Sequence, residues 1–199
     1  MSMLPYDERL GALFSTAAQV FARKGYHATT MRDLSRESGM SLAGMYHYVE
    51  GKEDLLFQIQ QRCFAGVLVG AEGALAAHTR PDERLRAFVR HHLAFFAAQP
   101  AEMKVLSHEA DSLTGQRAEE IRRLKRRYAD LLEAVVREAD GGDPTVGAYA
   151  LFGMMNWTYT WFRPDGRLSP DGLAEAFAAL FLHGVRGDGG ARTPPARPR

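Results

Sequence analysis

Cysteine is almost absent from this chain: a single one, Cys63, occurs in 199 residues. A single cysteine excludes an internal disulfide framework and a cysteine-based zinc site, and it is typical of proteins kept in a reducing compartment. Long hydrophobic runs are lacking as well, because no stretch approaches about 18 uncharged apolar residues. The N-terminus has neither the basic start nor the apolar run of a signal peptide. These absences predict a cytoplasmic protein with no membrane partner.

An excess of charge of one sign is also missing. The net charge is +1, and the first 60 residues carry six basic against seven acidic residues, a net charge of −1. Bulk charge therefore gives no indication of a nucleic-acid partner. Any DNA-binding function must depend on where a few charges are placed.

Catalytic and metal-binding motifs are missing too. The sequence has no Gly-x-Ser-x-Gly, no phosphate-binding loop and no His-Glu-x-x-His. None of the seven histidines has a glutamate three positions before it, which excludes the di-iron bundle motif. We expect no catalytic residues and no metal ligands, and we interpret His91, His92 and His108 as packing or pocket-rim residues.

Helix-forming residues are abundant instead. Ala, Leu, Arg and Glu dominate, and apolar residues repeat at the spacing of amphipathic helices. This pattern predicts an all-α protein of about nine helices, with a three-helix helix-turn-helix domain at the N-terminus and a helical bundle at the C-terminus. The expected helices cover residues 7–24, 31–38, 42–48, 52–78, 82–98, 101–112, 115–139, 144–163 and 170–186.

Two of these helices are short and separated by a glycine-containing turn, the pattern of a helix-turn-helix. Thr30 can cap the first, Gly39 can end it, and Ser41 can cap the second. On the second helix, Met45 and Val49 lie about one turn apart and can anchor it to the helices before it. The remaining side chains of the second helix are then expected to face outward.

These outward residues have the chemistry of a DNA-reading surface. Leu42 and Ala43 suit contact with a thymine methyl group, and Gly44 lets the backbone approach base edges. The hydroxyl of Tyr46 and the imidazole of His47 can reach phosphate oxygens, which fixes register without reading sequence. Thr30 and Lys52 can bind phosphates at the starts of two helices. The predicted DNA-binding residues are Thr30, Ser41, Leu42, Ala43, Gly44, Tyr46, His47 and Lys52.

A family resemblance is carried by residues across these helices: Gly25-Tyr26, Thr29-Thr30-Met31, Leu34, Gly39-Met40-Ser41, Tyr46-His47-Tyr48 and Lys52-Glu53-Asp54-Leu55. Over about residues 7–58 the chain resembles the DNA-binding domain of the TetR/AcrR family. The resemblance implies a homodimeric transcriptional regulator, usually a repressor, that leaves a palindromic double-stranded DNA operator when it binds a small hydrophobic effector. Ser35 and Ser38 depart from the alanines common in the family. Leu42 replaces a frequent basic residue, so we expect base readout to depend on backbone contact and DNA shape.

The resemblance also implies a domain division. We expect a DNA-binding domain at residues 1–55, which includes the start of the fourth, linking helix, and an effector-binding and dimerisation domain at 56–186. A Gly- and Pro-rich segment at 187–199 is expected to be a disordered tail. The segment 149–163 is apolar all round, so it must be covered on more than one side. One face is expected to meet the partner subunit, with dimerisation residues Trp161, Leu173, Phe177, Leu180 and Phe181, and the other to line a pocket.

A further resemblance concerns the effector. The run from Met155 to Gly166 resembles TetR regulators that sense coenzyme A thioesters in fatty-acid degradation. An acyl chain needs an apolar tunnel and the coenzyme A phosphates need arginines at its mouth, which the segment 117–137 can supply. The predicted ligand-binding residues are Phe96, Met103, Arg122, Arg126, Tyr128, Met155, Asn156, Trp157, Tyr159 and Arg163. No cofactor is expected, the effector being the candidate acyl-CoA.

Several alternatives stay open at this point. The regulator could sense an unrelated lipophilic drug or signal, the aromatics could be plain core, and the basic segment could be a solvated face paired with Glu119, Glu120 and Asp130. From a different class, a helical-bundle enzyme acting on a thioester or redox substrate is the other hypothesis. Residues 29–55 could also be a corner of another helical bundle.

Overall fold

The computed structural model describes residues 6–109, 111–139, 142–163 and 166–185. Within these ranges the regular structure is entirely helical, which confirms the predicted fold class. The elements are α1 (Tyr6–Lys24), α2 (Met31–Ser38), α3 (Leu42–Tyr46), α4 (Lys52–Ala76), α5 (Pro81–Ala98), α6 (Pro100–His108), α7 (Gly115–Glu138), α8 (Pro144–Asn156), the 3₁₀ turn η1 (Trp157–Thr160) and α9 (Pro170–Val185). The tail expected at 187–199 lies outside the described residues.

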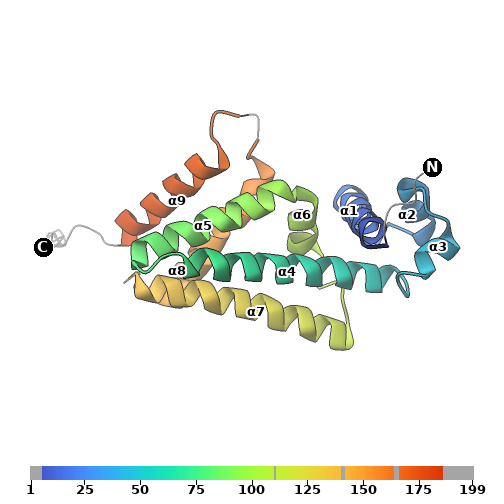
Figure 1. The fold of residues 1–199 in the computed structure, drawn as a ribbon, viewed down its shortest axis with the longest axis horizontal. Helices are drawn as coiled ribbons and strands as arrows, with labels where there is room; N and C mark the ends of the chain where they lie inside the picture. Colours follow the sequence, from blue (N-terminus) through green and yellow to red (C-terminus); the bar gives the residue numbers. More distant parts are fainter. Residues whose placement is uncertain (1–5, 110, 140–141, 164–165, 186–199) are drawn as a thin grey trace, which may run out of the picture.

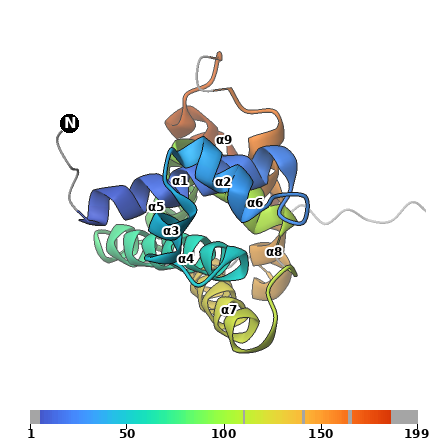
Figure 2. The ribbon, with the colours of Figure 1, turned by 90° about the vertical axis from the view of Figure 1, so that its right-hand side faces the viewer.

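The helices form an elongated molecule with α1, α2 and α3 gathered at one end (Figure 1). Helix α4 starts beside α3 and runs along the molecule, with α5 and α7 packed against it. Viewed from the end that carries α2 and α3, the chain shows α7 below α4 and α8 to one side (Figure 2). Helix α9 packs on α5. No helix of the described part of the chain is both long and apolar enough to cross a bilayer.

Local signals explain the start and end of the short helices. Thr30 accepts a hydrogen bond from the Asp33 N–H while the Asp33 carboxylate accepts one from the Thr30 N–H, which makes a capping box at α2. Gly39 ends α2 in the left-handed conformation, with φ 69°. Ser41 caps α3 by accepting a hydrogen bond from the Gly44 N–H. The predicted bounds of α2 are therefore confirmed to the residue.

One hydrophobic core extends from the end that carries α1, α2 and α3 into the rest of the molecule, and α4 contributes to it along its whole length. Near its start Leu55 and Leu56 are buried, and further along Val67, Leu68 and Leu75 are buried in the same core. Because interiors are packed as densely as organic crystals, displacement of one end of α4 is felt at the other.

The prediction of one helix over residues 144–163 was wrong for the residues after Asn156. Helix α8 ends at Asn156, and the chain tightens into η1. The hydroxyl of Thr158 donates to the Met155 carbonyl at 2.7 Å, and that of Thr160 to the Trp157 carbonyl at 2.7 Å. Threonine side chains that bind nearby carbonyls compete with the helical pattern, which favours the tighter turn. Helix α6 is also shorter than expected, since it ends at His108 rather than near residue 112.

Candidate DNA-binding surface and effector site

The short helix α3 presents its side chains as the sequence predicts. Met45 and Val49 are buried in the core, and α3 packs on α2. Ala43, Tyr46 and His47 are exposed, with 53% of Tyr46 accessible, whereas Leu42 and Gly44 are half-buried. These side chains are thus available to a partner, and their contact with DNA stays a prediction.

The turn between α2 and α3 is held by the two serines that depart from the family pattern. The Ser35 hydroxyl donates to the Met40 carbonyl at 2.6 Å. The Ser38 hydroxyl donates to the Ser35 carbonyl at 3.4 Å and accepts from the Met40 N–H at 3.3 Å. Alanine could make none of these bonds, so the departure strengthens the turn that orients α3.

Most of the positive charge near α2 is paired. Lys24 and Arg36 both bind the Asp33 carboxylate, at 2.7 and 2.8 Å. The hydrogen bond from Lys24, followed by those from Thr30, lowers the pKa of Asp33 well below its usual range. The Thr30 hydroxyl also donates to Asp33 at 2.7 Å. The proton that we expected Thr30 to offer to a phosphate is therefore already used.

Lys52 also has a role that the sequence did not predict. Its ammonium donates to the carbonyls of Tyr26 and Thr29, at 2.9 and 2.8 Å, with His27 at 3.4 Å, and lies 4.4 Å from the Tyr26 ring centre. Three acceptors saturate an ammonium group. Instead of a free phosphate clamp, Lys52 is a brace that fixes the loop between α1 and α2 to the start of α4.

Arg32 is the cation that the sequence reasoning missed. It lies exposed on α2, and no ion pair joins it to any other described residue. The sequence could have identified Arg32, because no acidic residue stands three or four positions away from it on the same helix to form an ion pair. We add Arg32 to the candidate phosphate-binding residues.

Hydrogen bonds connect the DNA-binding end to the rest of the molecule through the segment after α6. The Glu109 carboxylate accepts the Tyr26 N–H at 3.0 Å and the Ser112 hydroxyl at 2.8 Å. The Glu109 carbonyl accepts from the side chain of Gln60, which is buried on α4, at 3.1 Å. The α6–α7 segment is thus tied both to the α1–α2 loop and to α4.

The start of α7 is tied to the start of α4 in the same way. The Glu53 carboxylate accepts from the N–H and the hydroxyl of Thr114, at 3.1 and 3.0 Å. Arg117 binds Glu50 at 2.7 Å and Asp54 at 3.3 Å. Together with the Glu109 bonds, these contacts form what we call the interdomain link.

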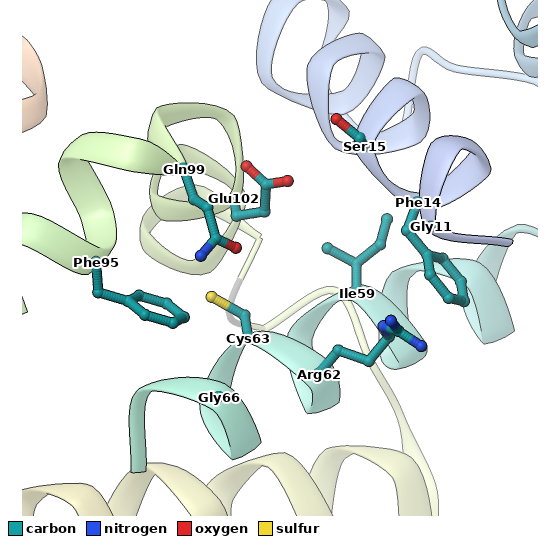
Figure 3. Close-up of a pocket in the computed structure, with 10 residues that line it drawn as sticks. All are labelled: Gly11, Phe14, Ser15, Ile59, Arg62, Cys63, Gly66, Phe95, Gln99 and Glu102. Atoms are coloured by element: carbon teal, nitrogen blue, oxygen red, sulfur yellow. The ribbon is translucent and has the colours of Figure 1, made fainter. Parts of the chain in front are cut away.

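A cavity of about 320 Å³ lies where α1 meets α4 and the α5–α6 corner (Figure 3). Phe14 and Ile59 give it apolar walls, while Arg62 and Glu102 carry charge at its edge. None of the ten predicted ligand residues lines it. Cys63 also faces the cavity. Burial raises the pKa of its thiol to about 12, so the thiol stays protonated and unreactive. The lining is Gly11, Phe14, Ser15, Ile59, Arg62, Cys63, Gly66, Phe95, Gln99 and Glu102.

A buried aromatic cluster lies between α5, α7 and α8. Phe88 stacks on Tyr128 with ring centres 5.2 Å apart, and His92 stacks on the same ring at 5.9 Å. Phe96 lies 4.7 Å from His92, and Phe152 lies 5.8 Å from it. The predicted ligand residues Phe96 and Tyr128 are therefore brought together here, in the company of a histidine that the prediction left out.

Of the other predicted ligand residues, Asn156 lies near His92 of that cluster, and the rest do not join it as one set. Arg122, Arg126 and Arg163 are exposed, and Trp157 is 62% exposed. Tyr159 binds His108 of α6 at 2.8 Å. Met103 and Met155 are buried core residues. The sequence analysis also considered ion pairs between the basic segment and Glu119, Glu120 or Asp130, and none of these forms among the described residues. Arg127 instead binds Glu72 of α4, and Glu120 accepts a hydrogen bond from Gln61.

The predicted dimer residues differ in how exposed they are, and their contact with a partner stays a prediction. Leu173 is buried within the chain, Phe181 is 7% exposed and Phe177 is half-buried, whereas Leu180 and Trp161 are exposed. Helix α8 adds two large exposed apolar side chains: Val146 (67%), which the sequence reasoning missed, and Tyr149 (61%), which belongs to the segment 149–163 expected to be covered. Between α8 and α9 lies a groove of about 460 Å³ lined by Asp143, Val146, Gly147, Ala150, Met154, Leu180, Phe181 and Gly184.

No group of three or more His, Cys, Asp or Glu side chains placed to hold a metal ion occurs in the described ranges.

Comparison with known proteins places these features in a family. Residues 13–59 match the model of the bacterial regulatory proteins of the tetR family, and residues 78–185 match the tetracyclin repressor-like C-terminal domain. The crystal structure of AibR in complex with isovaleryl coenzyme A and operator DNA is 33% identical in sequence, with a TM-score of 0.78, over 86% of this chain and 97% of that one.

Curated relatives match over most of their length. The transcriptional regulator BetI of Agrobacterium fabrum is 30% identical over 86% of this chain and 84% of its own. The transcriptional repressor KstR2 of Mycolicibacterium smegmatis is 27% identical over 89% of this chain and 90% of its own. The similarity therefore covers both the DNA-binding end and the helical bundle.

Proposed function

Because the chain belongs to the TetR family of bacterial regulatory proteins, we infer that it is a ligand-responsive transcriptional repressor and not an enzyme. The observation that carries this inference is the helix-turn-helix itself. Helix α3 is capped by Ser41, is anchored through Met45, and exposes Ala43, Tyr46 and His47. Its working place is then the cytoplasm, where bacterial operator DNA lies.

The protein binds double-stranded operator DNA as a homodimer. Two recognition helices enter successive major grooves when they lie about 34–36 Å apart, so the operator is a palindrome with one half-site for each subunit. The apolar groove between α8 and α9, with Val146, Tyr149 and Leu180 exposed beside it, provides the surface for the second subunit. A dimer also compensates for the weak charge of each DNA-binding domain, because each subunit contributes the same few phosphate contacts.

Effector binding acts on this dimer mechanically. The interdomain link fastens α6 and α7 to the α1–α2 loop and to the start of α4. A ligand that displaces the helices of the effector domain therefore shifts the recognition helices away from the spacing that DNA requires. To move the population from 99:1 to 1:99, the ligand must favour the non-binding form by about 5.5 kcal/mol.

For the effector we propose an acyl-CoA. Support comes from the similarity to AibR, which was crystallised with isovaleryl coenzyme A, and from the apolar cluster between α5, α7 and α8 that suits an acyl chain. An unrelated lipophilic compound is the second candidate, because aromatic walls alone do not distinguish the two ligands.

The test begins with the operator. Selection from random double-stranded DNA with the full chain is expected to yield a palindrome, and failure to enrich one would contradict the DNA-binding function. Operator affinity is then measured with isovaleryl-CoA and with acyl-CoAs of increasing chain length, and coenzyme A alone serves as the control. Release by one acyl-CoA but not by coenzyme A supports the proposal. Unchanged affinity at every chain length would rule out the acyl-CoA and leave the repressor function intact.

A further inference from the structure

His92 is a buried polar side chain whose hydrogen bonding is incomplete. Only 2% of it is exposed, among Phe96, Phe152 and Tyr128. Its Nδ1 lies 3.0 Å from the Tyr128 hydroxyl oxygen. Its Nε2 is buried and has no hydrogen-bond partner among the described residues. The Asn156 side chain lies near enough to favour the charged ring, but no hydrogen bond of good geometry joins it to Nε2.

The protonation states of His92 and Tyr128 follow from the burial of both side chains. Burial lowers the pKa of His92 to about 3, and burial raises the pKa of Tyr128 well above its usual value, so both groups are neutral near pH 7. Two arrangements of the protons are then possible. If Nδ1–H donated to the phenol oxygen, the phenol proton and the Nε2 lone pair would both be unsatisfied. If the phenol donates to Nδ1, only one group is left over, the Nε2–H donor, and this arrangement costs less.

An unsatisfied buried donor is destabilising unless something else accepts its hydrogen bond. The surrounding rings of Phe96 and Phe152 are apolar, and the cluster that we describe contains no Lys or Arg side chain. A neutral donor with apolar walls suits a carbonyl oxygen carried on an apolar body. It does not suit a free carboxylate, because burial of an unpaired charge is costly.

We propose that the Nε2–H of His92 donates a hydrogen bond to the carbonyl oxygen of the effector, the thioester carbonyl of an acyl-CoA. This inference deepens the proposed function and rests on it. Tyr128 is the positioning residue, because its hydroxyl holds the His92 ring and selects the tautomer with the proton on Nε2. The Asn156 side chain lies near the His92 ring, at the point where α8 ends and the exposed Trp157 follows. An effector that enters there can leave its polar part at the surface.

The experiment compares two ligands that differ in this carbonyl alone. Isovaleryl-CoA and its thioether analogue S-(3-methylbutyl)-CoA, in which two hydrogens replace the carbonyl oxygen, are titrated calorimetrically into the full-length protein. We expect the wild type to bind the thioester about tenfold more tightly, the effect of one buried hydrogen bond. In the double variant His92→Phe/Tyr128→Phe this ratio is expected to fall to about one. The variant His92→Gln, which keeps an N–H donor near the same place, is expected to retain part of it.

The double variant is chosen because it removes both polar partners together, which leaves stability nearly unchanged or improves it. Thermal unfolding without ligand checks that it is folded. The inference is overturned if the double variant keeps the tenfold ratio, or if the wild type binds both ligands equally well; neither result affects the effector proposal. If the wild type binds neither ligand and no other acyl-CoA, the effector proposal and this inference fall together.

Discussion

At the scale of single residues, Ser35 shows how much of the DNA-binding geometry depends on one hydrogen bond. Its hydroxyl donates to the half-buried Met40 carbonyl and closes the turn before α3. We expect Ser35→Ala to lower the free energy of unfolding by about 1 kcal/mol, because the carbonyl loses its partner. Urea denaturation measures this loss. Ser107→Ala, at an exposed position on α6, is the control. Equal stability of the two variants would show that the bond has no net effect.

Residues on the outer face of α3 are expected to divide into two functional kinds. Tyr46→Phe and His47→Ala remove groups that we expect to contact phosphate oxygens, so each should weaken binding of all DNA sequences alike. Leu42→Lys introduces a donor beside the bases and should change which base is preferred. Binding to a library of operator variants distinguishes the two kinds. Altered sequence preference in Tyr46→Phe would mean that the assignment of the two faces is reversed.

His92 predicts a pH dependence of stability. Its pKa is about 3 in the folded chain because of burial, against about 6.5 when unfolded. Between these two pKa values the unfolded chain binds a proton on His92 and the folded chain does not. The free energy of unfolding is therefore unaffected by His92 above pH 6.5 and decreases as the pH falls towards 3. From pH 7 to pH 5 the wild type should lose about 2 kcal/mol more than His92→Phe/Tyr128→Phe. His91, whose pKa burial also lowers, is present in both chains. Parallel stability curves for the two chains would contradict the prediction.

At the scale of the helix, two glycines of α4 should respond to alanine in opposite ways. A Cβ on Gly70 would lie 2.3 Å from Cε1 of His91, whereas one on Gly73 would meet nothing within 4 Å. The His91 ring is held by the bond between its Nε2 and the Val67 carbonyl, at 3.0 Å, so it cannot move without loss. Gly70→Ala should destabilise the protein by about 1–3 kcal/mol through overpacking. Gly73→Ala should stabilise it by up to about 1 kcal/mol through helix propensity.

Thermal unfolding of the two variants provides the measurement, with the wild type as reference. A stabilised Gly70→Ala would show that α4 and α5 can separate at this point without cost. An unchanged Gly73→Ala would show that the exposed part of α4 gains nothing from better helix propensity.

The helices also show which features a sequence can predict. Helix α2 and the start of α3 are specified by local signals, Thr30, Gly39 and Ser41, that act within a few residues. The end of α8 is not, because the apolar pattern continues past Asn156 while the hydroxyls of Thr158 and Thr160 bind carbonyls three residues earlier. Competition between a side chain and the helical pattern depends on rotamers that spacing does not reveal.

The candidate site follows the same division. The exposure of Ala43, Tyr46 and His47 could be predicted because it follows from helical phase. The role of Lys52 could not, because its three acceptors come from a loop more than twenty positions earlier. His92, interpreted from the sequence as a packing or pocket-rim residue, is buried, but its unsatisfied Nε2 depends on how α5, α7 and α8 meet. The proposed effector contacts therefore depend on residues that are distant from one another in the sequence.

At the scale of the whole molecule, the interdomain link joins the segment between α6 and α7 to the end of the molecule that carries α1, α2 and α3. The core is continuous along α4, so packing alone would transmit a general displacement. The ion pairs and hydrogen bonds of Glu109, Thr114 and Arg117 connect particular elements. A displacement of the α6–α7 segment is therefore passed to the α1–α2 loop and to the start of α4. Allosteric coupling through such an element is a free energy that mutation can reduce without abolishing either binding event.

Arg117 provides the test of this coupling, because α7 also carries a matched control. Arg117 binds Glu50 and Asp54 at the start of α4, whereas Arg127 binds Glu72 farther along the same helix. We expect Arg117→Gln to bind operator and effector separately, but to reduce the factor by which effector weakens operator binding several-fold, within the range of about 5- to 150-fold typical of allosteric coupling. Arg127→Gln should keep the wild-type factor. Fluorescence anisotropy of labelled operator, titrated at zero and saturating effector, gives the factor for each chain. Equal factors in both variants would show that the coupling passes through the packed core of α4 and not through Arg117.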